Sequence, residues 1–161
     1  MSYKKMAMFL ILAPGVFFLV YWLYISQSNI GVELTGIPTP TQYVSLNRQV
    51  TAEGIAYTAS GSELLFTDTL DLSNNTAVAD PGHIFAGLSL TNDSDITVYQ
   101  VQVIDSKGQA YRPLDVEQEV VSRNFNLPQE TNQLFLFKVN KSSGPFFLQL
   151  NNDSRLTWRF E

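Results

Sequence analysis

Residues 84–103, IFAGLSLTNDSDITVYQVQV, decide the fold class of this chain. In the first half, every second side chain is apolar, so four of them share one face of an extended strand: Ile84, Ala86, Leu88 and Leu90. The second half repeats the pattern with Tyr99, Val101 and Val103. Between them lies Asn92-Asp93-Ser94-Asp95, a run of residue types that favour turns. This period-two alternation predicts two β-strands joined by a turn.

The same alternation continues toward the carboxyl terminus. It predicts strands at residues 134–139, 146–150 and 156–160, and weaker ones at 50–57, 64–70 and around Tyr111. The runs DSKG (105–108) and SSGP (142–145) supply turn residues between strands. No window in this part of the chain shows sustained helical spacing of apolar residues. Because the last strand contains Trp158 and Phe160, we expect it to lie inside a sheet.

These patterns predict an all-β fold, an immunoglobulin-like antiparallel β-sandwich over residues 44–161. A small β-barrel is the alternative. Residues 26–43 contain Ser, Asn and Gly, and Pro38 and Pro40 stiffen the segment. We therefore expect residues 26–43 to form an extended stalk.

The amino-terminal part of the chain has a different character. Residues 6–25, MAMFLILAPGVFFLVYWLYI, are twenty residues without a charge, long enough to cross a bilayer once as one N-terminal transmembrane α-helix. Lys4 and Lys5 precede this segment and no basic residue follows before Arg48, which places residues 1–5 in the cytoplasm as a short tail. The remainder would then be periplasmic or extracellular. A cleaved signal peptide is the alternative, although such segments are shorter and end in small residues.

Five residues of this segment are candidates for anchoring or for docking a partner helix. Pro14-Gly15 lies in mid-span, where a tolerated kink and a notch for close helix packing are both consistent with the residue types. Tyr21, Trp22 and Tyr24 gather at the outer end, where aromatic rings favour the headgroup layer.

Composition excludes several classes of function. The chain has no cysteine, which excludes disulfides, thiolate nucleophiles and iron–sulfur ligation. Eight basic and fifteen acidic residues follow residue 25, so the exported part has a formal charge of −7. We therefore expect no binding to nucleic acid and no docking on anionic headgroups.

Few residues are candidates for a catalytic or metal-binding role. His83 is the only histidine, and a metal site normally needs several such ligands. Asp93 and Asp95 could offer oxygens to calcium, but their run lacks the spacing of an EF-hand loop, so a turn is the favoured interpretation. We expect no cofactor and no metal.

Two further groups of residues are weak candidates for a catalytic role. Asp115, Glu117 and Glu119 would share one face if their segment were extended, and paired carboxylates serve glycosidases. A solvated edge or loop is the favoured interpretation of this group. Ser62 follows a glycine but lacks the setting of a nucleophile elbow, which favours a turn.

Three stretches between residues 85 and 150 carry a resemblance. LSLTNDSD (88–95) is followed by VQVIDSKGQAY (101–111), which contains an Asp-x-x-Gly-x-x-Tyr pattern, and by LPQETNQLFLFKV (127–139). In this order they resemble the bacterial exported immunoglobulin-like domains related to the mycobacterial immunoprotective extracellular antigen. Pro128-Gln129 departs from the Pro-Gly usual in that family. The resemblance implies an envelope location and a binding or structural role, and it implies no catalytic residue.

The sequence therefore predicts a non-enzymatic, membrane-anchored envelope protein. We expect it to be an accessory or scaffolding subunit of a membrane protein complex, with a membrane protein partner and lipid contacts through its helix. No small-molecule substrate is evident. The alternative is a stand-alone adhesion or ligand-sensing ectodomain with the helix as a tether, and an enzyme is the third option.

Overall fold

The computed structural model describes residues 35–73, 75–93, 100–128 and 133–161. They belong to the larger of two compact units, Val32–Glu161. The predicted cytoplasmic tail, the predicted membrane helix with its five candidate residues, and most of the predicted stalk lie outside the described residues. Among the helices that are described, none is long and apolar enough to cross a membrane.

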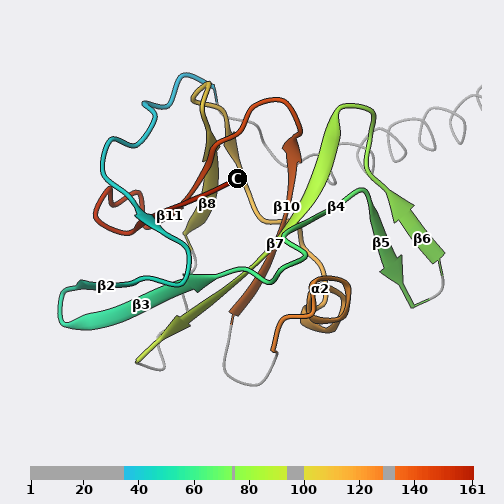
Figure 1. Cartoon of the computed structure of the whole chain (residues 1–161), viewed down its shortest axis with the longest axis horizontal. Helices are drawn as coiled ribbons and strands as arrows, with labels where there is room; N and C mark the ends of the chain where they lie inside the picture. The colour runs from blue at the N-terminus through green and yellow to red at the C-terminus, as the bar shows by residue number, and fades with distance from the viewer. Residues whose placement is uncertain (1–34, 74, 94–99, 129–132) are drawn as a thin grey trace, which may run out of the picture. The chain divides into compact units, whose positions relative to one another are not determined.

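The described residues are mostly β-structure (Figure 1). The elements are β1 (Val44–Ser45), β2 (Gln49–Ala52), β3 (Ile55–Ser60), β4 (Phe66–Thr67), β5 (Thr69–Leu72), β6 (Asn75–Val78), β7 (His83–Asn92), β8 (Val101–Asp105), β9 (Ala110–Tyr111), α2 (Gln118–Phe125), β10 (Gln133–Asn140), β11 (Phe146–Leu150) and β12 (Thr157–Phe160).

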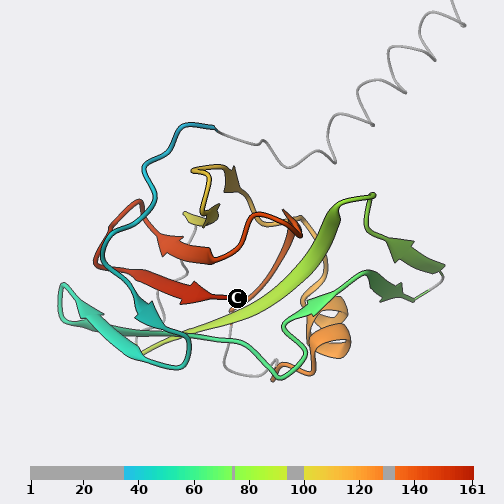
Figure 2. The same cartoon turned by 45° about the horizontal axis from the view of Figure 1, so that its top comes forward.

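The strands form two packed sheets and a separate ribbon (Figure 2). The first sheet has the order β1-β12-β11-β8-β9, and the second has the order β10-β7-β3-β2, with β4 also paired to β7. Strands β5 and β6 form a two-stranded ribbon. The predicted all-β sandwich is thus confirmed. The prediction that it is wholly antiparallel is wrong at one edge, because β1 pairs with β12 in parallel.

The pairing of β7 and β10 in the second sheet explains the alternation of apolar residues in the first half of the stretch 84–103. Strand β10 pairs along its whole length with residues 83–90 of β7, from Gln133 opposite Leu90 to Asn140 opposite His83. Side chains alternate between two cores, as the period of two requires. Those facing the first sheet include Ala86, Leu88, Leu90, Phe137 and Val139, and those facing α2 include Phe85, Leu134 and Leu136.

The last strand lies inside the first sheet, as expected from its aromatic residues. β12 is flanked by β1 and β11. Trp158 is 0% exposed, and its indole Nε1 donates to the carbonyl of Arg48 at 2.8 Å. This bond satisfies the polar atom that a buried tryptophan would otherwise leave unpaired.

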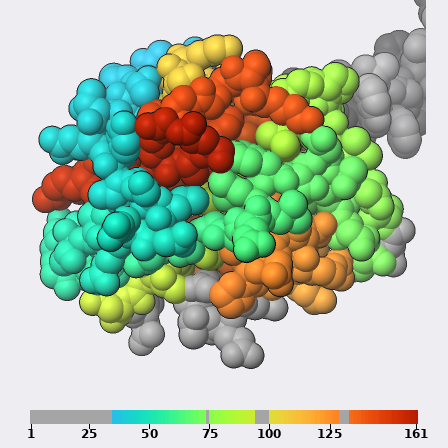
Figure 3. Space-filling model, viewed as in Figure 1, coloured from blue at the N-terminus to red at the C-terminus, as the bar shows by residue number. Residues whose placement is uncertain are grey.

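Helix α2 was missed by the sequence analysis. It packs on the outer face of the second sheet, and its surface is continuous with that of β4 and β5 (Figure 3). Val121 and Phe125, four residues apart, face that sheet and are fully buried. Gly87 makes this approach possible, because a Cβ there would overlap the Phe125 ring. With two apolar positions of this kind in a helix of eight residues, the helical period is too short to recognise.

Two weaker strand predictions were wrong in detail. Residues 50–57 contain the hairpin of β2 and β3, which turns at Glu53 and Gly54 with φ of 54° and 81°. Residues 64–70 are divided between β4 and β5, which belong to different sheets. The short strand at Tyr111 is confirmed as β9, and Gly108 in the preceding turn has the expected positive φ of 75°.

The described end of the predicted stalk contacts the domain. The amide of Ile37 donates to the carbonyl of Gly108 at 3.0 Å, and the Tyr43 ring lies 5.2 Å from that of Phe147. At these points the segment is held by the first sheet.

Candidate functional site

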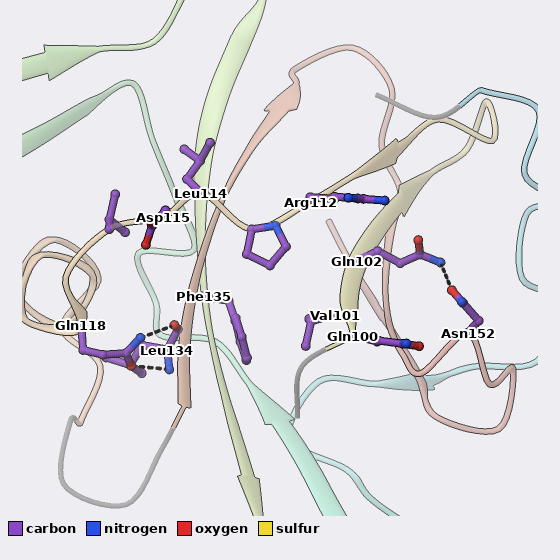
Figure 4. Close-up of a pocket in the computed structure, with 12 residues that line it drawn as sticks. Gln100, Val101, Gln102, Arg112, Leu114, Asp115, Gln118, Leu134, Phe135 and Asn152 are labelled. Carbon is purple, nitrogen blue, oxygen red and sulfur yellow. Dashed lines mark hydrogen bonds between the residues drawn. The ribbon is translucent and has the colours of Figure 1, made fainter. Parts of the chain in front are cut away.

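A groove of about 670 Å³ opens between β8 of the first sheet and β10 of the second (Figure 4). We call it the amide groove, because Gln100, Gln102, Gln118 and Asn152 line it. Between these amides lie apolar side chains that include Val101 and Phe135. The segment that connects β9 to α2 crosses the groove and contributes Arg112, Leu114 and Asp115. Its size falls in the range of ~300–1,000 Å³ typical of small-molecule sites.

The backbone of β10 beside the amide groove is already paired. The side-chain amide of Gln118 donates to the carbonyl of Leu134 at 2.8 Å and accepts from its N–H at 2.7 Å. The N–H of Leu114 donates to the carbonyl of Leu136 at 2.7 Å. Gln118 therefore takes the place of a neighbouring strand, so these groups are closed to a further strand.

The opposite wall combines fixed and free amides. Gln102 Nε2 donates to Gln149 Oε1 and to Asn152 Oδ1, each at 3.0 Å, and these bonds hold the wall in place (Figure 4). The side chains of Gln100, Arg112 and Asp115 form no hydrogen bond or ion pair with any residue that the structure describes. Several donors and acceptors thus face solvent around an apolar centre.

The β5–β6 ribbon has one closed edge. In an antiparallel pair, every second residue directs its N–H and C=O away from its partner strand. On β5 these residues are Thr69 and Asp71, and each has partners for both groups. Thr67 Oγ1 accepts from the Thr69 N–H at 3.3 Å and donates to its carbonyl at 2.9 Å.

Helix α2 closes the rest of that edge. Asn124 Oδ1 accepts from the N–H of Asp71 at 2.7 Å, and Asn124 Nδ2 donates to its carbonyl at 3.0 Å. Arg123 donates to the same carbonyl at 2.9 Å. These contacts also identify Asp71 and its opposite residue, Thr76, as an outward-facing pair.

The other edge of the ribbon is open. By the same alternation, Thr76 and Val78 of β6 direct their backbone groups away from β5. No hydrogen bond joins these outward groups to the residues that the structure describes. Val78 is 69% exposed, the largest exposed fraction among the large apolar side chains described. With respect to the described residues, the β6 edge therefore presents unpaired backbone beside an exposed apolar side chain, which is a template for another strand.

The Asp-x-x-Gly-x-x-Tyr pattern has a structural role. Asp105 is 0% exposed, and its Oδ1 accepts from the N–H groups of Lys107 and Gln109 at 2.8 and 2.9 Å. Its Oδ2 accepts from the Tyr111 hydroxyl at 3.0 Å. The carboxylate thus holds the turn between β8 and β9 from inside.

This environment shifts the pKa of both side chains. Burial alone would raise the pKa of Asp105, but the hydrogen bonds from Gln109, Ser143, Lys107 and Tyr111 outweigh burial and lower it. Burial, followed by the bond to Asp105, raises the pKa of Tyr111 to about 12. Asp105 is therefore ionised at neutral pH and engaged in the fold.

His83 lies at the start of β7, at the strand edge that was expected. Its Nδ1 is buried and has no hydrogen-bond partner among the described residues. Nearby, Lys138 donates to Asp80 at 2.8 Å, and this bond lowers the pKa of Asp80. The described residues contain no group of three His, Cys, Asp or Glu side chains able to hold a metal ion.

The remaining candidates do not assemble into a site. Asp93 Oδ1 accepts from the N–H of Ala56 at 2.9 Å, whereas Asp95 lies outside the described residues. Asp115 and Glu117 are exposed in the loop before α2, in agreement with the favoured interpretation, whereas Glu119 lies in the first turn of that helix, so the three do not share one extended face. Ser62 is a turn residue, as expected, and its Oγ accepts from the N–H of Leu64 at 3.1 Å.

Sequence reasoning missed both the amide groove and the β6 edge. The alternation of Gln100 and Gln102 with Val101 and Val103 was a signal that amides follow one face of a strand. It did not reveal that Asn152 and Gln118, from distant segments, would join them.

Comparisons with known proteins bear on the fold alone. No family model and no curated protein matches the chain. A crystal structure of a conserved hypothetical protein from Bacillus anthracis is similar with a TM-score of 0.52 and 12% identity, over 73% of this chain and 95% of that one. An uncharacterized beta-sandwich protein from Clostridium difficile 630 aligns with a TM-score of 0.34 and 12% identity, over 80% and 99% of the two chains. The first similarity agrees with the two-sheet architecture described above.

Proposed function

We propose that this chain is a non-enzymatic, membrane-anchored envelope protein that acts as an accessory or scaffolding subunit of a membrane protein complex. Its exported domain, an immunoglobulin-like sandwich, binds a protein partner, and the helix at residues 6–25 fixes the domain beside that partner. Pro14 and Gly15 offer a close-packing surface in the span, and the aromatic rings near residues 21–24 anchor its outer end.

The open β6 edge is the observation that carries this proposal. An unpaired strand edge is a hazard to a soluble protein, and side chains close such edges elsewhere in this domain. An edge left open beside an exposed valine is suited to strand addition, in which a partner segment continues the sheet through backbone hydrogen bonds. The partner supported by this geometry is a protein with an extended segment.

Co-purification of the full chain in a mild detergent tests the proposal. We expect a stoichiometric protein partner to be identified by mass spectrometry. Replacing Val78 with Lys puts a charge on the open edge and should reduce recovery of the partner at least about tenfold, because edge lysines oppose strand pairing. Replacing residues 6–25 with an unrelated span should also lose the partner.

Thr69 provides a matched control. It lies directly opposite Val78 but on the closed strand, so Thr69→Lys adds the same charge to the ribbon without touching the open edge. This variant should retain the partner. Purification of the wild-type chain alone, or equal loss of the partner in both variants, would contradict the proposal.

A ligand-sensing ectodomain is the second candidate, and the amide groove is the observation that favours it. In that case the helix is a tether, and an unrelated span in its place leaves ligand binding unchanged. The two candidates are thus separated by the effect of exchanging residues 6–25.

A further inference from the structure

We propose that the amide groove binds a neutral saccharide. This inference goes beyond the proposed function, because it concerns a different surface from the β6 edge and does not need a protein partner. It rests on which polar groups of the groove are already used, on the charge of its lining and on its apolar centre.

The used groups oppose strand addition to the β10 wall of the groove. Gln118 occupies the N–H and the carbonyl of Leu134, and Leu114 occupies the carbonyl of Leu136. A peptide strand entering the groove would find these backbone groups already hydrogen-bonded. Along this wall, the groove therefore recognises its ligand through side chains.

The charges in the lining select a neutral ligand. Among the described residues, Arg112 and Asp115 are the charged side chains that line the groove, one of each sign, so the formal charge of this lining is zero. A phosphate-rich or polyanionic ligand would meet the carboxylate, and a cation would meet the guanidinium. Neither side chain is held by an ion pair within the described part of the chain, so each is available to a ligand.

The polar side chains of the groove that have no partner among the described residues are suited to binding hydroxyl groups. Gln100, Arg112 and Asp115 together offer donors and acceptors, the combination that a hydroxyl, itself both donor and acceptor, can satisfy. Phe135 is half-buried between Val101 and Leu134, and its ring gives the apolar surface on which the C–H face of a sugar ring can pack (Figure 4). A cavity of about 670 Å³ has room for more than one sugar ring.

Titration calorimetry on the full chain, held in a detergent without a sugar headgroup, tests the inference. The probes are the N-acetylglucosamine trisaccharide and cellotriose, both neutral and differing in their acetamide groups. We expect saturable binding of at least one of them. Arg112→Ala and Asp115→Ala should each weaken binding about tenfold, because each removes a charge-assisted hydrogen bond.

Glu63→Ala is the matched control, since Glu63 is an exposed acidic residue that does not line the groove. It should leave the dissociation constant unchanged, and all three variants should unfold at the wild-type urea midpoint because the replaced side chains are exposed. Failure of both sugars to bind up to their solubility limits would overturn the inference. Binding that survives both groove substitutions, or tighter binding of a neutral extended pentapeptide, would overturn it as well. Neither result depends on whether Val78→Lys loses a protein partner.

Discussion

The two strands of the β5–β6 ribbon have the same length and lie side by side, yet their outer edges differ. On β5, Thr67 and two side chains of α2 engage every outward backbone group. On β6, the outward groups of Thr76 and Val78 have no partner among the described residues. The comparison shows that side chains from other elements close the outer edge of β5, whereas no described residue reaches the outer edge of β6, which is therefore available to a second molecule.

The outer edge of strand β10 is also covered by a side chain. Gln118 at the start of α2 covers Leu134, while Asn124 near its end covers Asp71. One short helix therefore closes edges of two sheets, and displacing it should open both.

The largest effect on stability is expected from Gly87→Ala. The added methyl group would overlap the Phe125 ring and push α2 off the second sheet, which would weaken the closure of β5 and β10 together. We expect a loss of about 3 kcal/mol in the free energy of unfolding, the upper end for overpacking a core. Urea denaturation measures this loss. The double variant with Phe125→Leu should recover part of it, and an unchanged midpoint in the single variant would show that α2 is not held this way.

Asp105→Asn tests how strongly the buried carboxylate stabilises the turn between β8 and β9. In the wild type, the carboxylate accepts hydrogen bonds from the N–H groups of Lys107 and Gln109, and the Asn side chain would replace one acceptor oxygen with an NH₂ donor. We therefore expect a loss of about 2 kcal/mol in the free energy of unfolding at neutral pH. Asp153→Asn, at a partly exposed carboxylate, should cost much less.

The same side chain gives a pH dependence with a definite sign. Because folding lowers the pKa of Asp105, its contribution to stability is present above the unfolded pKa of about 3.9 and is lost as pH falls through the lower folded pKa. The stability difference between wild type and Asp105→Asn should therefore shrink below pH ~4. A difference that stays constant down to pH ~2 would contradict this role.

Asn124→Ala opens the closed strand of the ribbon. It removes the acceptor for the Asp71 N–H and one donor to its carbonyl, and we expect a cost of about 1 kcal/mol. Hydrogen exchange is the sharper measurement, because the Asp71 amide should exchange faster in the variant. Glu119→Ala, on the same helix, should leave that amide protected.

The smallest effect on stability is expected from Val78→Lys. The side chain is exposed and the backbone groups at this position bond to no described residue, so the free energy of unfolding should change by less than about 0.5 kcal/mol. In the wild type, the Thr76 and Val78 amides should exchange faster than that of Asp71. Slow exchange at Thr76 in the isolated protein would mean that this edge is closed after all.

Sequence reasoning recovered the strands whose alternation is strong. Residues 84–90 and 134–139 were read correctly because each is long and faces two apolar cores. The β2–β3 hairpin was read as one strand because Glu53-Gly54 is a weak turn signal inside a continuous pattern. Helix α2 was missed because its burial depends on Gly87, in a strand 34 residues away from Val121 along the chain.

Both candidate sites were beyond sequence reasoning for a related reason. Residues Gln100, Arg112, Gln118 and Asn152 come from four separate segments, and nothing local indicates that they meet. The strong motif, Asp105 with Gly108 and Tyr111, was visible because these three residues lie within six positions of each other in the sequence.

The sequence by itself determined the all-β class, the burial of the final strand and the hairpin at Asp105, because each depends on local periodicity or turn chemistry. The anchor at residues 6–25 stays a prediction from hydrophobic length. The tertiary structure alone decided which strand edges are closed, where the two sheets separate to leave the amide groove, and that no described residue covers the edge of β6. Those features depend on contacts between residues far apart in the chain, and a hydrogen bond such as that from the Asp71 N–H to Asn124 exists only after both segments have folded.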